Sequence, residues 1–188
     1  MKNVMLLISM LVTAFSLSAN EYQEVLTSYA TNQVKAIAAD PEIIAAVKKQ
    51  NVENKDLTQD QIISLDKKWR AEVGQSSAPM IEQTLASPTS KKLQDMQQGS
   101  SGAITEIFVM DDKGLNVAQS SVTSDYWQGD EAKWQKTFQA GPNAYHIGDV
   151  EEDESTQMFQ SQVSYAITDP ASGKVIGAIT VGVNVEEL

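Results

Sequence analysis

The stretch that decides the fold is ITEIFVMDDKGLNVAQS, residues 104–120. Its first seven positions are rich in β-branched and aromatic residues, as is typical of a strand. Residues 111–114 then read Asp-Asp-Lys-Gly, a tight turn in which Gly114 stands where a positive φ is needed. Residues 115–120 return as a second strand. The stretch therefore predicts a β-hairpin and, with it, an antiparallel sheet.

The chain after this hairpin predicts three more strands, over residues 144–150, 158–168 and 174–185. A short helix is expected between the second and third strands, over about residues 130–139. Turns are expected at 151–154 and 169–173, where acidic residues or Asp, Pro and Gly gather. The second half of the chain thus predicts five strands joined in an antiparallel run.

The chain before the hairpin predicts helices, because its apolar residues recur with a spacing close to 3.6. Asp40 before Pro41 fits a helix start, and Thr58 with Gln61 fits a capping box. We expect helices over residues 21–39, 42–49, 58–73, 79–86 and 88–98. Helices followed by strands predict an α+β domain rather than a doubly wound one. The expected single domain covers residues 20–188, with a helical part (20–98) and a sheet part (103–185).

Residues 1–19 predict a secretory signal peptide. A short basic start at Lys2 precedes an apolar run from Val4 to Leu17, and small residues up to Ala19 suit cleavage. The run is short for a membrane span, which needs roughly 20 residues; the alternative is an uncleaved N-terminal anchor. We therefore expect a periplasmic or secreted protein, with no membrane insertion after cleavage.

The composition of the chain argues against several classes of protein and site. The 188 residues include no Cys and carry a net charge of −11. The lack of Cys argues against a disulfide scaffold, and the charge disfavours nucleic acid as a partner. With one histidine and no Gly-x-Ser-x-Gly elbow, neither a zinc site nor a serine triad is supported. We expect no enzyme, no cofactor and no metal, although a hydrolase that uses Asp and Glu stays open as an alternative.

The candidate binding segment is SDYWQGDEAKW, residues 124–134, which we call the aromatic loop. Aromatic faces attract ammonium groups, and neighbouring carboxylates supply the opposite charge. A cationic or amine-containing ligand is therefore favoured. The alternative is that its two tryptophans simply fill the core. The candidate ligand-binding residues in this loop are Asp125, Tyr126, Trp127, Asp130 and Trp134.

Three further candidates lie on the strands and turns beyond the loop. His146 is expected on the third strand, and Asp153 lies in the acidic run 151–154, where its carboxylate would face the pocket as a counter-charge. That run is either a divalent-cation site or a solvated turn. Gln162 alternates with Gln160 and Ser164 along the fourth strand, so that one strand face is polar. This polar face is either exposed to solvent or the floor of a pocket.

Three segments together resemble the Cache family of extracytoplasmic sensor domains, a PAS-like group also called PDC. They are DPEIIAAV (40–47), IFVMDDKGLNVAQS (107–120) and GKVIGAITVGV (173–183). The resemblance implies N-terminal helices, then a five-stranded antiparallel sheet with a short helix between its second and third strands. It also implies a small-molecule pocket on one face of that sheet, closed by the loop and helix that follow the second strand.

The sequence departs from that family in two respects. The family's amino-acid sensors place an arginine near the aromatic pair, whereas the sole arginine of this chain, Arg70, is remote in sequence from Tyr126. An amino-acid carboxylate is therefore not favoured as the ligand. No second membrane segment or output domain follows the last strand, so we expect a sensor that signals through a membrane receptor or another periplasmic protein. The alternative from another class is a periplasmic structural or interaction protein without a ligand.

Overall fold

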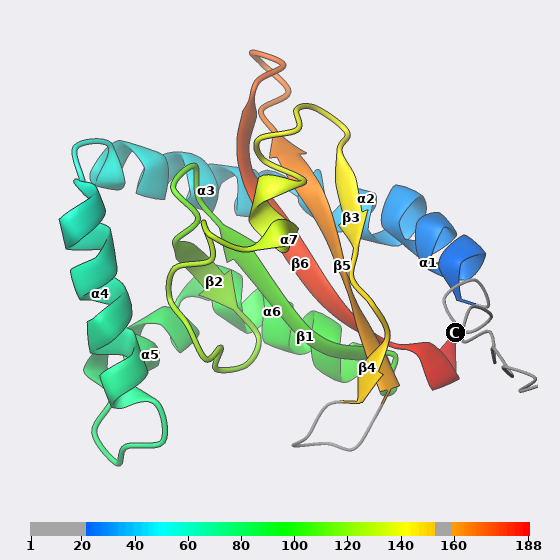
Figure 1. Ribbon diagram of the computed structural model, residues 1–188, viewed down its shortest axis with the longest axis horizontal. Helices are drawn as coiled ribbons and strands as arrows, with labels where there is room; N and C mark the ends of the chain where they lie inside the picture. The colour runs from blue at the N-terminus through cyan, green and yellow to red at the C-terminus, as the bar shows by residue number, and fades with distance from the viewer. Residues whose placement is uncertain (1–21, 153–158) are drawn as a thin grey trace, which may run out of the picture.

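The computed structural model describes residues 22–152 and 159–188. The predicted signal peptide and Asp153 lie outside these residues. The described strands form one antiparallel sheet with the order β2-β1-β6-β5-β3, and β4 pairs with β5 beside this path (Figure 1). The strands are β1 (Ile104–Met110), β2 (Asn116–Gln119), β3 (Tyr145–Ile147), β4 (Glu151–Glu152), β5 (Phe159–Thr168) and β6 (Val175–Asn184).

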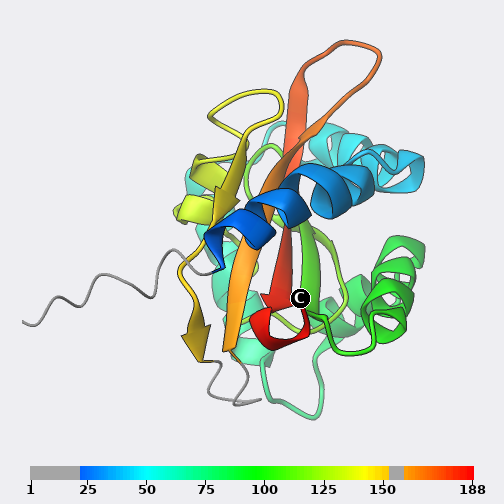
Figure 2. The same cartoon turned by 90° about the vertical axis from the view of Figure 1, so that its right-hand side faces the viewer.

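The helices lie on both faces of the sheet. Figures 1 and 2 show the N-terminal helices and α6 on one face and the short α7 on the other, with α4 and α5 beside β2. The N-terminal helix contains a π-helical segment, η1, between α1 and α2. The bounds are α1 (Gln23–Tyr29), η1 (Ala30–Val34), α2 (Lys35–Ala38), α3 (Pro41–Asn54), α4 (Gln59–Glu72), α5 (Pro79–Leu85), α6 (Pro88–Gly99), α7 (Ala132–Gln135) and the 3-10 turn η2 (Val185–Glu187).

The predicted hairpin is present, and its turn is tightly held. β1 and β2 pair antiparallel, and Gly114 has a φ of 81°. The buried Asp111 Oδ1 accepts hydrogen bonds from the backbone N–H groups of Lys113 and Leu115, both at 2.9 Å. A Cβ atom at Gly114 would lie 2.6 Å from the backbone of Gly129. Glycine is therefore required here both by its backbone conformation and by the close approach of the aromatic loop.

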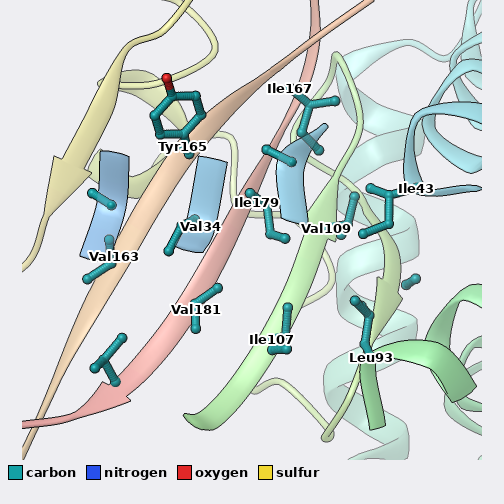
Figure 3. Close-up of a cluster of buried hydrophobic side chains, with 14 of the residues drawn as sticks. Val34, Ile43, Leu93, Ile107, Val109, Val163, Tyr165, Ile167, Ile179 and Val181 are labelled. Atoms are coloured by element: carbon teal, nitrogen blue, oxygen red, sulfur yellow. The ribbon is translucent and has the colours of Figure 1, made fainter. Parts of the chain in front are cut away.

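The main core lies between the N-terminal helices, α6 and one face of the sheet (Figure 3). Alternate residues of the strands point into it, as the period of two requires. Val34, Ile43 and Leu93 come from the helices and are fully buried. A smaller cluster on the opposite face joins α7 to the sheet through Phe108, Met110, Trp134 and Ala178.

Several predicted boundaries were wrong. The helix expected over 42–49 continues to Asn54 because its polar last turns bond to the sheet. Gln50 and Asn54 donate to Asp111 Oδ2, at 3.0 and 2.8 Å, and Asn51 donates to the carbonyl of Ile176 at 2.7 Å. The helix expected over 130–139 is only the four-residue α7, and the turn expected at 151–154 begins with β4.

The capping predictions were confirmed. Asp40 Oδ1 accepts from the backbone N–H of Glu42 at 2.9 Å, and Thr58 with Gln61 forms a reciprocal capping box. Within residues 22–152 and 159–188, none of the helices combines the length and apolarity that crossing a membrane requires.

Candidate ligand-binding site

A polar cavity of about 350 Å³ opens on the face of the sheet that carries α7. We call it the α7-face cavity. Its walls come from the start of α7, from β5, and from the connection between β3 and β4. The residues that line it are Glu131, Lys133, Gly148, Asp149, Glu151, Gln160 and Gln162.

The floor of this cavity follows from the alternation along β5. Val163 and Tyr165 point into the main core, so that Gln160 and Gln162 point to the α7 side. The sequence left open whether this polar strand face meets solvent or a pocket. Gln160 and Gln162 line the cavity, whereas Ser164 is fully buried and shares a hydrogen bond with Thr180 at 2.9 Å. Gly182 lies opposite Gln162 in the register, where a Cβ atom would approach Thr105 Oγ1 closely.

The charges around the cavity are unequal. Lys133 is held down toward the sheet, with its Nζ 2.9 Å from Glu131 Oε2 and 5.4 Å from the centroid of the Phe108 ring. Its side chain is only 16% exposed. Glu131 offsets this one cation, and Asp149 and Glu151 are exposed carboxylates on the rim. The cavity therefore carries a net negative charge, which favours a positively charged guest.

The aromatic loop is attached to α4 by one carboxylate. Asp66 Oδ1 accepts hydrogen bonds from the backbone N–H groups of Tyr126 and Trp127, both at 3.0 Å. Asp66 Oδ2 in turn lies 2.7 Å from Arg70 Nε. Asp66 is 8% exposed, so this is a partly desolvated anchor rather than a surface contact.

The expectation that no arginine lies near the aromatic pair was wrong. Arg70 Nη1 lies 2.8 Å from Asp125 Oδ1, in an ion pair that lacks the alignment of a hydrogen bond. The residues are far apart in sequence, and only the packing of α4 against the loop brings them together. Asp125 is thus already paired within the protein and does not line the α7-face cavity.

The three aromatic candidates do not form one cage. Tyr126 stacks on Trp69 of α4, with ring centroids 5.3 Å apart. Trp127 is half-buried and donates from Nε1 to the carbonyl of Lys113 at 2.8 Å. Trp134 is 7% exposed, packs in the smaller core, and donates to the carbonyl of Asp111 at 3.0 Å. The core-filling alternative therefore holds for Trp134.

The remaining candidates divide between the cavity and the surface. Gln162 lines the cavity, whereas His146 lies opposite Ser164 on the same face, outside the lining residues. Partial burial lowers the pKa of His146, and the charge of Lys136 lowers it further, while Asp149 opposes the shift. Asp130 is exposed. Within the described part of the chain, no group of three or more His, Cys, Asp or Glu side chains is placed to hold a metal ion.

Sequence reasoning missed two features of this region. Glu131 and Lys133 line the cavity, although neither was a predicted site residue. Asp66 and Arg70 hold the loop from a helix some 60 residues earlier, and neither was a predicted site residue. Their i,i+4 spacing was the only available signal.

The main element order matches the expected one, with the short β4 as an addition. N-terminal helices precede an antiparallel sheet whose main path has five strands, and a short helix lies between the second and third. This order is the one that the resemblance to the Cache family implies.

A comparison with solved structures finds matches of low similarity to this chain. The sensor domain of the V. cholerae histidine kinase DctB is 14% identical, with 88% of this chain and 58% of that one covered and a TM-score of 0.38. The sensory domain of the Campylobacter jejuni chemoreceptor Tlp3 is 12% identical, with coverage of 87% and 64% and a TM-score of 0.42. The ligand-binding domain of the Pseudomonas aeruginosa PAO1 amino acid chemoreceptor PctC, in complex with GABA, is 12% identical. The match covers 88% of this chain and 60% of that one, with a TM-score of 0.36.

This chain spans about three fifths of the length of each of those domains. At these identities and TM-scores, the likeness transfers no ligand, partner or activity to it. No family model matches the chain, and no curated protein does either.

Proposed function

We propose that this protein is an exported sensor module that binds a small amine in the α7-face cavity and reports its state to a partner protein. The observation that supports the proposal is the charge of that cavity. Two rim carboxylates, Asp149 and Glu151, are left over after Glu131 offsets Lys133. The amides of Gln160 and Gln162 form the floor, where Gln160 accepts from Thr105 Oγ1 and Gln162 donates to Glu106 Oε1 at 2.8 Å.

The size of the cavity suits this role. A volume of about 350 Å³ lies within the range of small-molecule pockets, roughly 300–1,000 Å³. An ammonium group placed between Asp149 and Glu151 would form charge-assisted hydrogen bonds, which are stronger than neutral ones. The proposal assigns no catalysis, and its partner is a membrane receptor or another periplasmic protein.

A thermal-shift series on the purified protein tests amine binding. Putrescine, ethanolamine and choline are compared with propionate, which carries the opposite charge. A ligand at 100 times its Kd stabilises the folded state by about 2.7 kcal/mol, which raises Tm by roughly 5–10 °C for a domain of this size. At least one amine is expected to reach this shift, and propionate is expected to give none.

Two matched variants locate the site. Asp149→Asn removes a carboxylate from the cavity rim, whereas Asp95→Asn removes an exposed carboxylate on α6 and makes the same change in net charge. We expect Asp149→Asn alone to reduce the amine shift. Equal shifts in the two variants, or no shift with any amine in the unaltered protein, would contradict the proposed site.

Export is tested separately. Mass spectrometry of the periplasmic fraction is expected to find a chain that begins close to Asn20, after cleavage at Ala19. Recovery of the full-length chain from the membrane fraction would show that the N-terminal segment is kept as an anchor.

A further inference from the structure

A second cavity, of about 430 Å³, lies between α3, α4, α5 and the edge strand β2. We call it the edge cavity. It shares no lining residue with the α7-face cavity, and Figure 1 shows α4 and α5 beside β2. The lining residues that matter for its chemistry are Lys49, Lys68, Asn116, Tyr126, Leu65 and Met80.

Asn116, one of the lining residues, carries an acceptor that has no partner. The residue is 1% exposed, and its Nδ2 donates to Thr123 Oγ1 at 2.8 Å and to the carbonyl of Asp125 at 3.0 Å. Its Oδ1 is buried and has no hydrogen-bond partner among the residues that the structure describes. Buried polar atoms in folded proteins nearly always have a partner, so a guest that donates a hydrogen bond here would satisfy this atom.

The cavity also gathers positive charge on an otherwise acidic protein. Lys49 and Lys68 both line it, from α3 and α4. Lys49 has Glu53 at 3.8 Å, and Lys68 has no ion pair within the described ranges 22–152 and 159–188. Two ammonium groups at one cavity favour a carboxylate and disfavour a second ammonium. The group that donates to Asn116 is therefore better supplied by a hydroxyl than by an amine.

Apolar surface completes the cavity. Leu65 and Met80 line it from α4 and α5. The ring of Tyr126 is held in place by stacking on Trp69, with centroids 5.3 Å apart. Ligand pockets commonly combine such apolar walls with a few fixed polar groups.

We propose that the edge cavity is a second binding site, which takes a small hydroxy-carboxylate with an apolar side chain. The carboxylate lies toward Lys49 and Lys68, the hydroxyl donates to Asn116 Oδ1, and the side chain contacts Leu65 and Met80. This site is independent of the amine site, because no residue belongs to both.

Three compounds with one skeleton test the chemistry by isothermal titration calorimetry on the purified protein. They are 3-phenyllactate (each enantiomer), 3-phenylpropionate and phenylalanine, which differ only in bearing a hydroxyl, a hydrogen or an ammonium group. One enantiomer of 3-phenyllactate is expected to bind roughly tenfold more tightly than either of the others, the change that one net hydrogen bond produces. Equal affinities for all three, or no binding of 3-phenyllactate, would overturn the proposal.

Two neighbouring lysines provide the matched control for location. Lys68→Gln removes a charge from the cavity, and Lys67→Gln removes an exposed charge one position earlier on α4 that does not line it. Lys68→Gln should weaken 3-phenyllactate binding at least fivefold, and Lys67→Gln should leave it unchanged. Equal affinities of the two variants, or loss of binding on Asp149→Asn instead, would place the compound outside the edge cavity and refute the proposal.

Discussion

Replacing Asp66 in two ways separates the two roles of this carboxylate in holding the aromatic loop. Its Oδ1 accepts from the backbone N–H groups of Tyr126 and Trp127, and its Oδ2 pairs with Arg70. Asp66→Asn keeps an oxygen acceptor in place for the two N–H groups and loses the charge. Asp66→Ala loses both functions.

The magnitudes differ enough to be measured. A hydrogen bond to a charged group contributes about 1.5–3 kcal/mol, so two such bonds give about 3–6 kcal/mol for Asp66→Ala. In Asp66→Asn the two backbone bonds fall to the neutral range of about 0.5–1.5 kcal/mol each. The ion pair is lost as well, but the side chain of Arg70 is 56% exposed, so solvent screens the pair and its loss adds only about 1 kcal/mol or less.

Equilibrium unfolding in urea, followed by tryptophan fluorescence, gives the free energy of unfolding for each variant. Trp69 is fully buried beside the loop and reports on it directly. A domain is typically stable by about 5–15 kcal/mol, so we expect Asp66→Ala to remain folded without urea and to unfold in one cooperative transition. If the two substitutions reduce the free energy of unfolding equally, the backbone bonds contribute nothing and the anchor described here does not exist.

Two further predictions follow from local geometry. Gly114→Ala should destabilise the protein by at least about 1 kcal/mol more than Gly173→Ala in the same urea assay. Both residues have a positive φ (81° and 70°), but only a Cβ atom at Gly114 would meet backbone atoms, at 2.6 Å. Equal losses would mean that the aromatic loop does not contact the turn this closely. Partial burial acts to raise the pKa of Asp40, but hydrogen bonds from Lys92 and from the backbone lower it below its ordinary 3.8. The stabilisation that the ionised Asp40 gives the folded state is complete above pH 3.8 and is lost as the pH falls through the lower folded pKa. Asp40→Asn should therefore reduce the free energy of unfolding near pH 6 and change it little near pH 2. A difference in unfolding free energy that does not vary with pH would contradict the lowered pKa.

The parts of the fold that sequence predicted are those that local chemistry determines. The hairpin was predicted because Gly114 follows three polar residues between two runs with strand character. The helix starts at Asp40 and Thr58 were predicted because a cap needs only a side-chain oxygen and the N–H groups two or three residues later. Each of these signals lies within a few residues of the feature that it specifies.

The parts that sequence could not predict depend on contacts between distant segments. The last turn of α3 reads as a polar loop until Asn54 is seen to donate to Asp111, 57 residues later. Trp127 and Trp134 look equivalent in sequence, yet one is half-buried and the other fills the smaller core. Whether an aromatic residue lines a pocket or fills a core depends on which face of the sheet its segment crosses, and composition does not encode this.

The hairpin turn is hydrogen-bonded to elements on both faces of the sheet. The carboxylate of Asp111 accepts from Gln50 and Asn54 of α3, while its carbonyl accepts from Trp134 on the opposite face. The inner end of α7 is therefore tied to a turn whose first residue, Asp111, is fully buried and hydrogen-bonded through both its carboxylate and its carbonyl. The outer wall of the α7-face cavity is different, because β3 has three residues and β4 only two, most of them exposed or half-buried.

Local stability in proteins follows burial and hydrogen bonding, so the β3–β4 edge opens more readily than the hairpin. A ligand can shift a conformation only where it makes different contacts in two states. Under the proposed function, an amine held by Asp149 and Glu151 would act on this weak edge, while the hairpin and the edge cavity behind it stay fixed.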